Sequence, residues 1–208
     1  MRLMILILHL IIVDAIYTDE NIDAVTRLNI PDVKKFCRII QCIDEKTFDL
    51  NISANNISYE SNTVRFKYHL YDDNLIVIPK LNLAKLDKLD FDGEFTIAHS
   101  SVIALIKGST IATDTNKIYL TIKDDNLFGE LTDRARANTD SYGLKLSDTY
   151  KGNKFGNAIP LNFEIFRIIS SMKFNNINGR LVSSMGVITF GMQLGKANIR
   201  FILSALAN

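Results

Sequence analysis

An imperfect internal repeat constrains the fold of this 208-residue chain more than any other feature of its sequence. The segments IPDVKKFCRIIQ, from Ile30, and IPLNFEIFRIIS, from Ile159, share Ile, Pro, Arg, Ile and Ile at identical offsets. Each is preceded by an alternating polar and apolar segment, 21–29 or 141–149, and followed by three segments with a β pattern. Five identities alone would be weak evidence, but the matching order of the flanking segments indicates a duplicated α+β unit.

Three segments have the apolar spacing of amphipathic helices. These helices are predicted over residues 31–42, 100–112 and 160–172. In the first of them, Cys37 falls on the apolar stripe and is expected to be a small core residue. Cys42 points in another direction, because five residues turn a helix through about 140°. The two cysteines are therefore expected to be reduced, with no functional thiol pair.

Most of the remaining sequence alternates as β-strands do. The predicted strands are Thr47–Ser53, Asn56–Glu60, Thr63–Tyr71, Lys117–Lys123, Leu127–Thr132, Ser141–Thr149, Gly179–Ser184, Val187–Leu194 and Ala197–Leu206. Between the two copies of the repeat, residues 72–94 show neither a clean helix nor a long strand, and they contain Pro79. This segment is interpreted as a connector between two domains.

The first twenty residues, MRLMILILHLIIVDAIYTDE, admit two interpretations. A basic residue before an apolar run is typical of a secretory signal peptide, which would be cleaved near Ala15. The repeat instead places this segment where the second copy has its hairpin, and His9 interrupts the apolar run. We therefore expect 3–13 to form a buried β-strand and 14–21 to form a turn and connection.

Composition and motifs exclude several classes of function. The 24 Lys and Arg residues against 23 Asp and Glu residues give a net charge of +1, so bulk charge selects no partner. The sequence has no glycine-rich phosphate loop, nucleophile elbow or metal-ligand cluster. Its three histidines lie far apart, and two glycosylation sequons, at Asn51 and Asn56, fall in a region rich in Asn and Ile. We expect a protein that is not an enzyme and that binds no metal.

The order of elements in the second half resembles that of the DNA sliding clamps, and in particular the homotrimeric clamps of tailed myophages. The resemblance is carried by the successive segments EFTIA, SSVIALIKGSTIA, NKIYLTIKDDNLFGELTD, SYGLKLSDT, PLNFEIFRIISSM and ANIRFILSAL. The first half matches only from NIDAVTRLNIPDVKKFCRIIQCI onward, without the family's opening strand and first helix.

The resemblance implies an α+β DNA-clamp fold of duplicated domains, with helices lining an inner face and antiparallel sheets outside. It places clamp domain one over residues 1–73, a connector over 74–93 and clamp domain two over 94–208. It also implies a homotrimeric ring that encircles duplex DNA and tethers the replicative polymerase. An ATP-dependent clamp loader would open the ring. No cofactor and no membrane are expected, and the location would be the cytoplasm of an infected host cell, without secretion.

Three sets of site residues follow from the resemblance. The expected DNA-binding residues on the polar sides of the helices are Lys34, Lys35, Arg38, Lys107, Arg167 and Lys173. The expected groove for partner peptides is formed by Leu75, Ile76, Val77, Ile78, Leu203 and Leu206. The expected subunit interface pairs Val64, Phe66 and Tyr68 of one chain with Tyr142, Leu144 and Leu146 of the next.

Each set also has a simpler interpretation. The cations are equally typical of a solvated helix face, and Glu164 on the same side argues against a strongly basic lining. The apolar connector residues fit a strand packed on its own domain. Two alternative functions remain open: an exported β-rich surface protein with a cleaved signal peptide, and a viral structural protein of duplicated β-rich domains.

Overall fold

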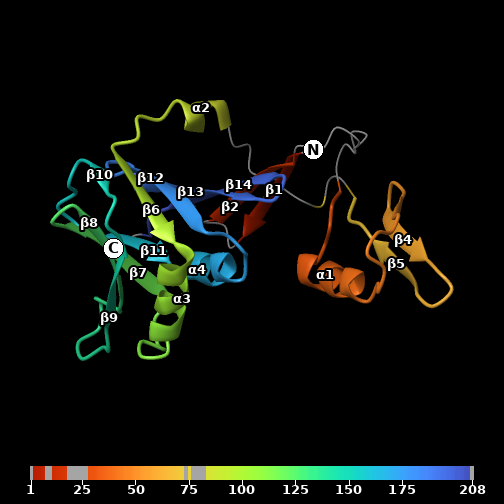
Figure 1. Cartoon of the computed structure of the whole chain (residues 1–208), viewed down its shortest axis with the longest axis horizontal. Helices are drawn as coiled ribbons and strands as arrows, with labels where there is room; N and C mark the ends of the chain where they lie inside the picture. The colour runs from red at the N-terminus through yellow and green to blue at the C-terminus, as the bar shows by residue number, and fades with distance from the viewer. Residues whose placement is uncertain (1, 8–10, 18–27, 73–74, 76–82, 207–208) are drawn as a thin grey trace. The chain divides into compact units, whose positions relative to one another are not determined.

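The computed structural model describes residues 2–7, 11–17, 28–72, 75 and 83–206 (Figure 1). The chain forms two compact units, one of residues 1–20 with 81–208 and one of residues 21–80. Within the described ranges, no helix is long and apolar enough to span a membrane.

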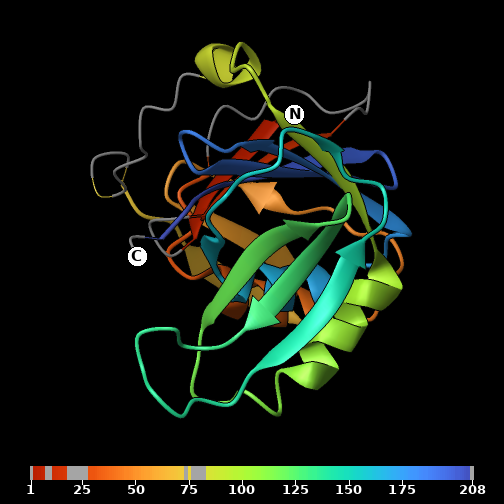
Figure 2. The same ribbon diagram turned by 90° about the vertical axis from the view of Figure 1, so that its left-hand side faces the viewer.

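The larger unit contains two antiparallel sheets. The seven-stranded sheet has the order β1 (Arg2–Ile7), β2 (Ile11–Tyr17), β14 (Ala197–Ser204), β13 (Val187–Leu194), β12 (Asn176–Val182), β6 (Gly93–Ala98) and β10 (Lys151–Gly152). The four-stranded sheet has the order β11 (Ile159–Asn162), β7 (Lys117–Lys123), β8 (Asn126–Leu131) and β9 (Tyr142–Ser147). Figure 2 shows β7, β8 and β9 running side by side.

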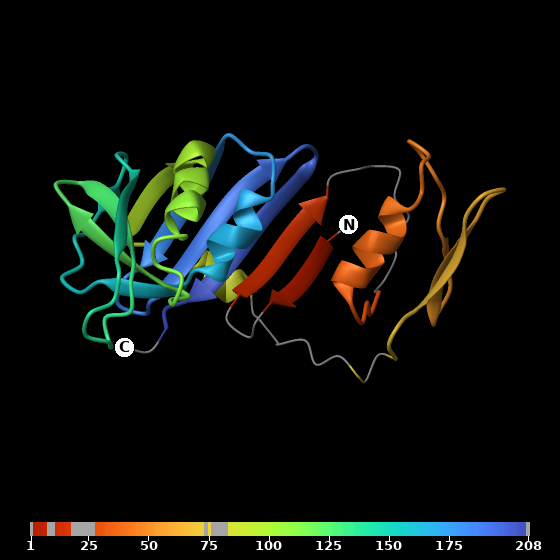
Figure 3. The same ribbon diagram turned by 90° about the horizontal axis from the view of Figure 1, so that it is seen from below.

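Two helices, α3 (His99–Gly108) and α4 (Glu164–Ser170), pack against each other in this unit (Figure 3). Their apolar sides are fully buried in one hydrophobic core that also contains inward-facing residues of both sheets. The buried helix residues are Val102 and Leu105 of α3 and Ile165, Phe166 and Ile169 of α4. Burying side chains of this size contributes about 1.5–3 kcal/mol each, so the core fixes both helices on the sheets.

The smaller unit contains α1 (Val33–Gln41) and a three-stranded antiparallel sheet of β3 (Asn51–Ile52), β4 (Asn56–Glu60) and β5 (Arg65–His69). Asp32 caps the helix, since its Oδ1 accepts a hydrogen bond of 2.9 Å from the backbone N–H of Lys35. The Tyr68 hydroxyl accepts a hydrogen bond from the Asp32 N–H at 2.9 Å and donates one to the Asp32 carbonyl at 2.8 Å. This tyrosine therefore fixes the start of α1 to β5.

The end of the connector packs on the larger unit. It forms the short helix α2 (Leu83–Asp87), which lies on the opposite side of the seven-stranded sheet from α3 and α4 (Figure 1). Asp87 forms an ion pair with Arg200 of β14, and the Asp92 N–H donates to the carbonyl of Leu181 at 3.0 Å. This part of the connector is thus attached to the larger unit, whereas Ile76, Val77 and Ile78, for which a packed strand was the simpler interpretation, lie outside the described residues.

The α+β fold class and most of the predicted strands are confirmed, but four details differ. The predicted helix over 160–172 begins only at Glu164, because 159–162 form β11 and pair with β7. The connector contains a helical turn that the sequence pattern did not show. Cys37 and Cys42 are both exposed free thiols, so Cys37 is not a core residue.

The N-terminal segment is the fourth difference. Its residues form a hairpin of β1 and β2, and residues 14–17 belong to β2 and not to a turn. The hairpin adds to the seven-stranded sheet through β14, with Arg200 opposite Asp14 in the backbone register. The expected strand over 21–29 lies mostly outside the described residues. The predicted boundaries of clamp domain one, after residue 73, and of the connector, after residue 93, stay predictions.

Candidate nucleic-acid interface and partner surfaces

Three of the predicted DNA-binding cations lie together on the helix pair of the larger unit. Lys107 is exposed in the last turn of α3, Arg167 is exposed on α4, and Lys173 is exposed just after α4. The buried sides of these helices face the sheets, so the exposed residues occupy the side that is turned away from the core. We call this exposed side of α3 and α4 the helix face.

Arg167 is held by a network of neighbours (its guanidinium is not a freely moving charge). One of its Nη atoms lies 3.1 Å from Glu164 Oε2 and donates to Asn116 Oδ1 at 3.1 Å. Its guanidinium carbon lies 4.9 Å from the centroid of the Phe163 ring. Asn116 in turn donates to Asn162 at 3.0 Å. Exposed ion pairs of this kind contribute about 0–1 kcal/mol to stability. This pair nevertheless orients the Arg167 side chain and offsets part of its charge.

The remaining predicted cations belong to the smaller unit. Lys35 and Arg38 are exposed on α1, and Lys34 also lies in this helix, although its side chain is outside the described part. The structure therefore brings Lys107, Arg167 and Lys173 onto one surface. A DNA contact by any of the six residues stays a prediction.

The predicted peptide groove corresponds only in part to a concave surface. Leu206 lines a surface pocket of about 370 Å³, together with residues that the sequence analysis did not single out. The other lining residues include Phe155, Ala158, Pro160, Gly186 and Ala205. The backbone N–H of Leu206 donates to the Pro160 carbonyl at 2.8 Å, which places the C-terminal segment beside β11. Apart from Leu206, the sequence did not point to this pocket, because its lining comes from segments that lie far apart in the chain.

The other predicted groove residues do not line this pocket. Leu203 is only 2% exposed and belongs to the hydrophobic core, while Leu75 is 66% exposed. Ile76, Val77 and Ile78 lie outside the described residues.

The predicted subunit-interface strands are both sheet edges in the described part of the chain. β5 is the last strand of the three-stranded sheet, and β9 is the last strand of the four-stranded sheet. Their named side chains turn toward the interior of their own units: Tyr68 and Leu146 are buried, and Val64, Phe66, Tyr142 and Leu144 are partly buried. A second chain would therefore meet chiefly the backbone edges of these strands and their outward-facing residues.

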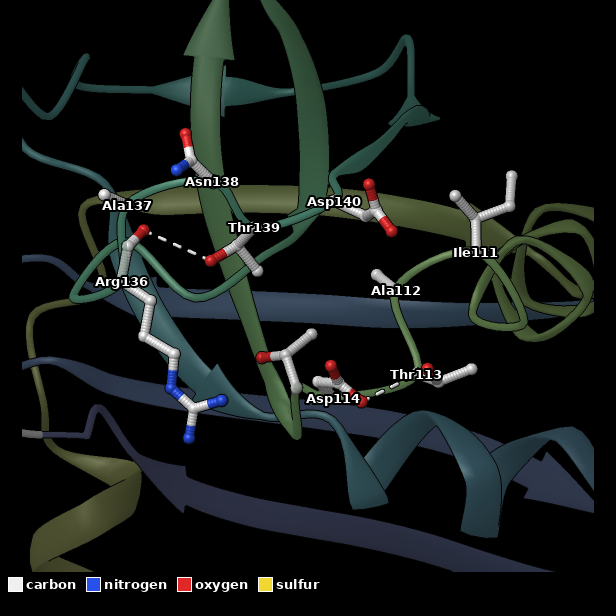
Figure 4. A pocket seen from close by; sticks show the side chains of 10 residues that line it. Ile111, Ala112, Thr113, Asp114, Arg136, Ala137, Asn138, Thr139 and Asp140 are labelled. Atoms are coloured by element: carbon white, nitrogen blue, oxygen red, sulfur yellow. Dashed lines mark hydrogen bonds between the residues drawn. The ribbon is translucent and has the colours of Figure 1, made fainter.

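A second pocket of about 170 Å³ lies between the loop after α3 and the loop between β8 and β9 (Figure 4). Its lining is mostly polar and comes from residues 111–115 and 136–140. Arg136 is paired with Asp133 at 3.1 Å, and the Thr139 hydroxyl donates to the Arg136 carbonyl. A search of the described residues finds no group of three or more side chains that could hold a metal ion. This pocket matches none of the predicted sites.

Comparison with known proteins identifies the fold. No family model and no curated protein sequence matches the chain. Among solved structures, the β subunit of the DNA polymerase of Streptococcus pyogenes has a TM-score of 0.71 at 15% identity, over 96% of this chain and 53% of that one. The C. crescentus β sliding clamp has a TM-score of 0.70 at 13% identity, over 96% and 52% of the two chains. The fold is that of a sliding clamp.

One further match covers a larger share of the matched protein. Proliferating cellular nuclear antigen from Entamoeba histolytica has a TM-score of 0.61 at 11% identity, over 96% of this chain and 82% of that one. The chain spans about half the length of the bacterial β subunits that it matches. The sliding-clamp fold predicted from the order of elements is confirmed, whereas the specific likeness to myophage clamps stays a prediction.

Proposed function

We propose that this chain is a subunit of a ring-shaped sliding clamp that encircles duplex DNA and tethers the replicative polymerase. The observation that carries the proposal is the sliding-clamp fold over nearly the whole chain, in which the helix pair presents cations on the side away from the core. The protein would act without catalysis, as a topological tether.

The helix face suits diffuse contact with DNA. Lys107, Arg167 and Lys173 would contact phosphates, and these contacts would not depend on base sequence, because the phosphate backbone is the same at every position. The pairing of Arg167 with Glu164 keeps the attraction modest. A ring that slides needs this combination, since strong or base-specific contacts would hold it at one site.

The ring would be a homotrimer whose subunits join through the edges of β5 and β9. Unpaired strand edges offer rows of free N–H and C=O groups to a second chain. Three subunits of two domains each would enclose the DNA, as the resemblance to the homotrimeric clamps implies. An ATP-dependent loader would open the ring, and the proposed setting is the cytoplasm of an infected host cell.

The pocket beside Leu206 and Pro160 is the proposed docking point for peptides of the polymerase and the loader. Its lining combines apolar residues with the polar side chains of Asn157, Ser183 and Ser184, which suits an extended peptide that carries both apolar anchors and hydrogen-bonding groups.

The proposed function is tested by loading the protein on DNA. The chain is incubated with circular duplex DNA and an ATP-driven loader from the same source, and bound protein is measured after gel filtration. We expect protein to stay on circles and to be lost after linearisation. Protein that stays on linear DNA with free ends would contradict a sliding ring, and blocking the ends should restore retention.

A further inference from the structure

Arg167 differs from the other two cations of the helix face, because fixed neighbours hold its charge. Its Nη1 donates hydrogen bonds to Glu164 Oε2 and to Asn116 Oδ1, both at 3.1 Å. None of the ion pairs among the described residues involves Lys107 or Lys173. The arginine is therefore the cation of this surface whose contact with a phosphate competes with a contact inside the chain.

The start of α4 fixes the amide of Asn116 so that its oxygen faces Arg167. Asn162 accepts the backbone N–H of Glu164 at 2.9 Å, which identifies the accepting atom of Asn162 as its Oδ1. Asn116 must then turn its Nδ2 toward this oxygen, and the two atoms lie 3.0 Å apart. The Oδ1 of Asn116 is thereby left to accept from the guanidinium. The fold thus gives Arg167 a second acceptor beside the carboxylate.

The Glu164 carboxylate and a DNA phosphate are alternative partners for Arg167. Both are anions that accept charge-assisted hydrogen bonds from a guanidinium. The pair of Arg167 and Glu164 is solvent-exposed, and exposed pairs of this kind shift an equilibrium by about fivefold or less. Such a contact lowers the fraction of time that the arginine spends on DNA, yet it is weak enough for a phosphate to replace the carboxylate.

We infer that Glu164 and Asn116 are positioning residues that hold Arg167 in a resting position, from which a DNA phosphate must displace it. The inference rests on the proposed function, since it takes DNA phosphates to be the ligand of the helix face. The guanidinium leaves Glu164 when a phosphate captures it, and it returns when that phosphate has moved past. The contacts of Arg167 with DNA are therefore brief, which favours movement along the duplex.

The chain contains a matched pair outside the helix face. Arg134 and Glu130 lie 2.7 Å apart, and their side chains are 44% and 37% exposed, against 45% and 34% for Arg167 and its glutamate. The guanidinium of Arg134 also lies over an aromatic ring, 4.4 Å from the centroid of Tyr119. Glu130 belongs to β8, on the side opposite the buried leucines of that strand. E130Q therefore releases an arginine from a similar setting that does not belong to α3 or α4.

A set of variants of the full chain tests the inference. Affinity for a short fluorescent DNA duplex is measured by anisotropy over a salt series for the natural sequence, E164Q, N116A, R167A, E164Q with R167A, and E130Q. E164Q should raise the affinity at low salt by about fivefold and should steepen the slope of log affinity against log salt by about one, because one more phosphate is neutralised. N116A should raise the affinity by a smaller factor. R167A should change little by itself and should abolish the gain of E164Q, whereas E130Q should change neither quantity.

The outcomes separate the inference from the proposed function. An affinity that E164Q leaves unchanged overturns the inference. A gain that persists in the R167A background overturns it too, because Glu164 would then repel DNA directly. An equal gain from E130Q does the same, since net charge alone would set the affinity. These three results leave the proposed function standing, whereas a failure of every variant to bind DNA at low salt overturns both. Circular dichroism checks that each variant is folded.

Discussion

At the scale of the residue, buried polar contacts hold the parts that present the candidate sites. Tyr68 is the clearest case, because its hydroxyl satisfies both the N–H and the carbonyl of Asp32 at the start of α1. The resemblance to sliding clamps assigned Tyr68 to a subunit interface, and that assignment stays a prediction. Within the chain, the Tyr68 ring packs on Phe36, with centroids 5.2 Å apart.

Tyr68→Phe should loosen the start of α1. The substitution keeps the ring but removes the two hydrogen bonds between the Tyr68 hydroxyl and the Asp32 backbone, which costs about 1–2 kcal/mol. Hydrogen exchange of the α1 amides should become faster, while exchange in the larger unit should not change. Tyr71→Phe is the control, because Tyr71 is 47% exposed. Equal exchange in both variants would show that the Tyr68 hydroxyl has no role in fixing the helix.

Tyr150 makes the stability of the larger unit depend on pH. Burial, and secondly the charge of Asp92, raise the pKa of Tyr150 above its ordinary value of 10.0. A group with a raised pKa contributes stability that is fully present below the unfolded pKa and lost as pH rises through the folded one. The free energy of unfolding should therefore fall from about pH 10 upward more steeply in the natural sequence than in Tyr150→Phe. Denaturant titrations across this range measure the difference, and parallel pH profiles would contradict it.

At the scale of the element, the periodicity of the sequence predicted where most strands and helices lie, but it predicted their first and last residues less well. β7 and β13 occupy the predicted residues, since their alternation is bounded by turn residues such as Asp124 and Gly195, both with positive φ. Residues 160–162 were included in the predicted helix over 160–172, whose apolar stripe runs from Ile165 to Met172. Residues 159–162 form a strand because they pair with β7, and the local spacing of apolar residues does not show this long-range contact.

The candidate surfaces also have features that local sequence predicts and features that it does not. The exposed positions of Lys107 and Arg167 follow from helical spacing, and the structure places them as predicted from that spacing. The pocket beside Leu206 did not follow, because its lining comes from loops far apart in sequence. The contacts of Arg167 with Glu164 and Phe163 lie within one turn of the chain, whereas its contact with Asn116 needs the fold.

The helix face makes a prediction for DNA binding. Lys107→Ala with Lys173→Ala should weaken binding to duplex DNA of any sequence. The slope of log affinity against log salt should fall by about one for each phosphate contact that is lost. Fluorescence anisotropy over a salt series measures both effects. Lys88→Ala is the control, since Lys88 is exposed just after α2, on the other side of the seven-stranded sheet. Equal effects of the two replacements would argue against the helix face.

At the scale of the whole molecule, the N-terminal hairpin distinguishes the proposed function from export. β1 and most of β2 would be lost by cleavage near residue 15, and β14 would then be an unpaired edge. Peptide mapping of the natural protein should therefore detect residues 1–15. A mature protein without them would favour the exported surface protein and would contradict the sliding ring.

The pairing of β2 with β14 also has a consequence for biosynthesis. These strands lie at opposite ends of the sequence, so the ribosome must complete almost the entire chain before the hairpin can meet its partner. Until then, the apolar segments RLMILI and IIVDAIY lack their place in the sheet. Contacts between such distant segments form slowly, and exposed apolar strands favour aggregation. The hairpin of β1 and β2 therefore exposes apolar strands from its own synthesis until β14 has been made.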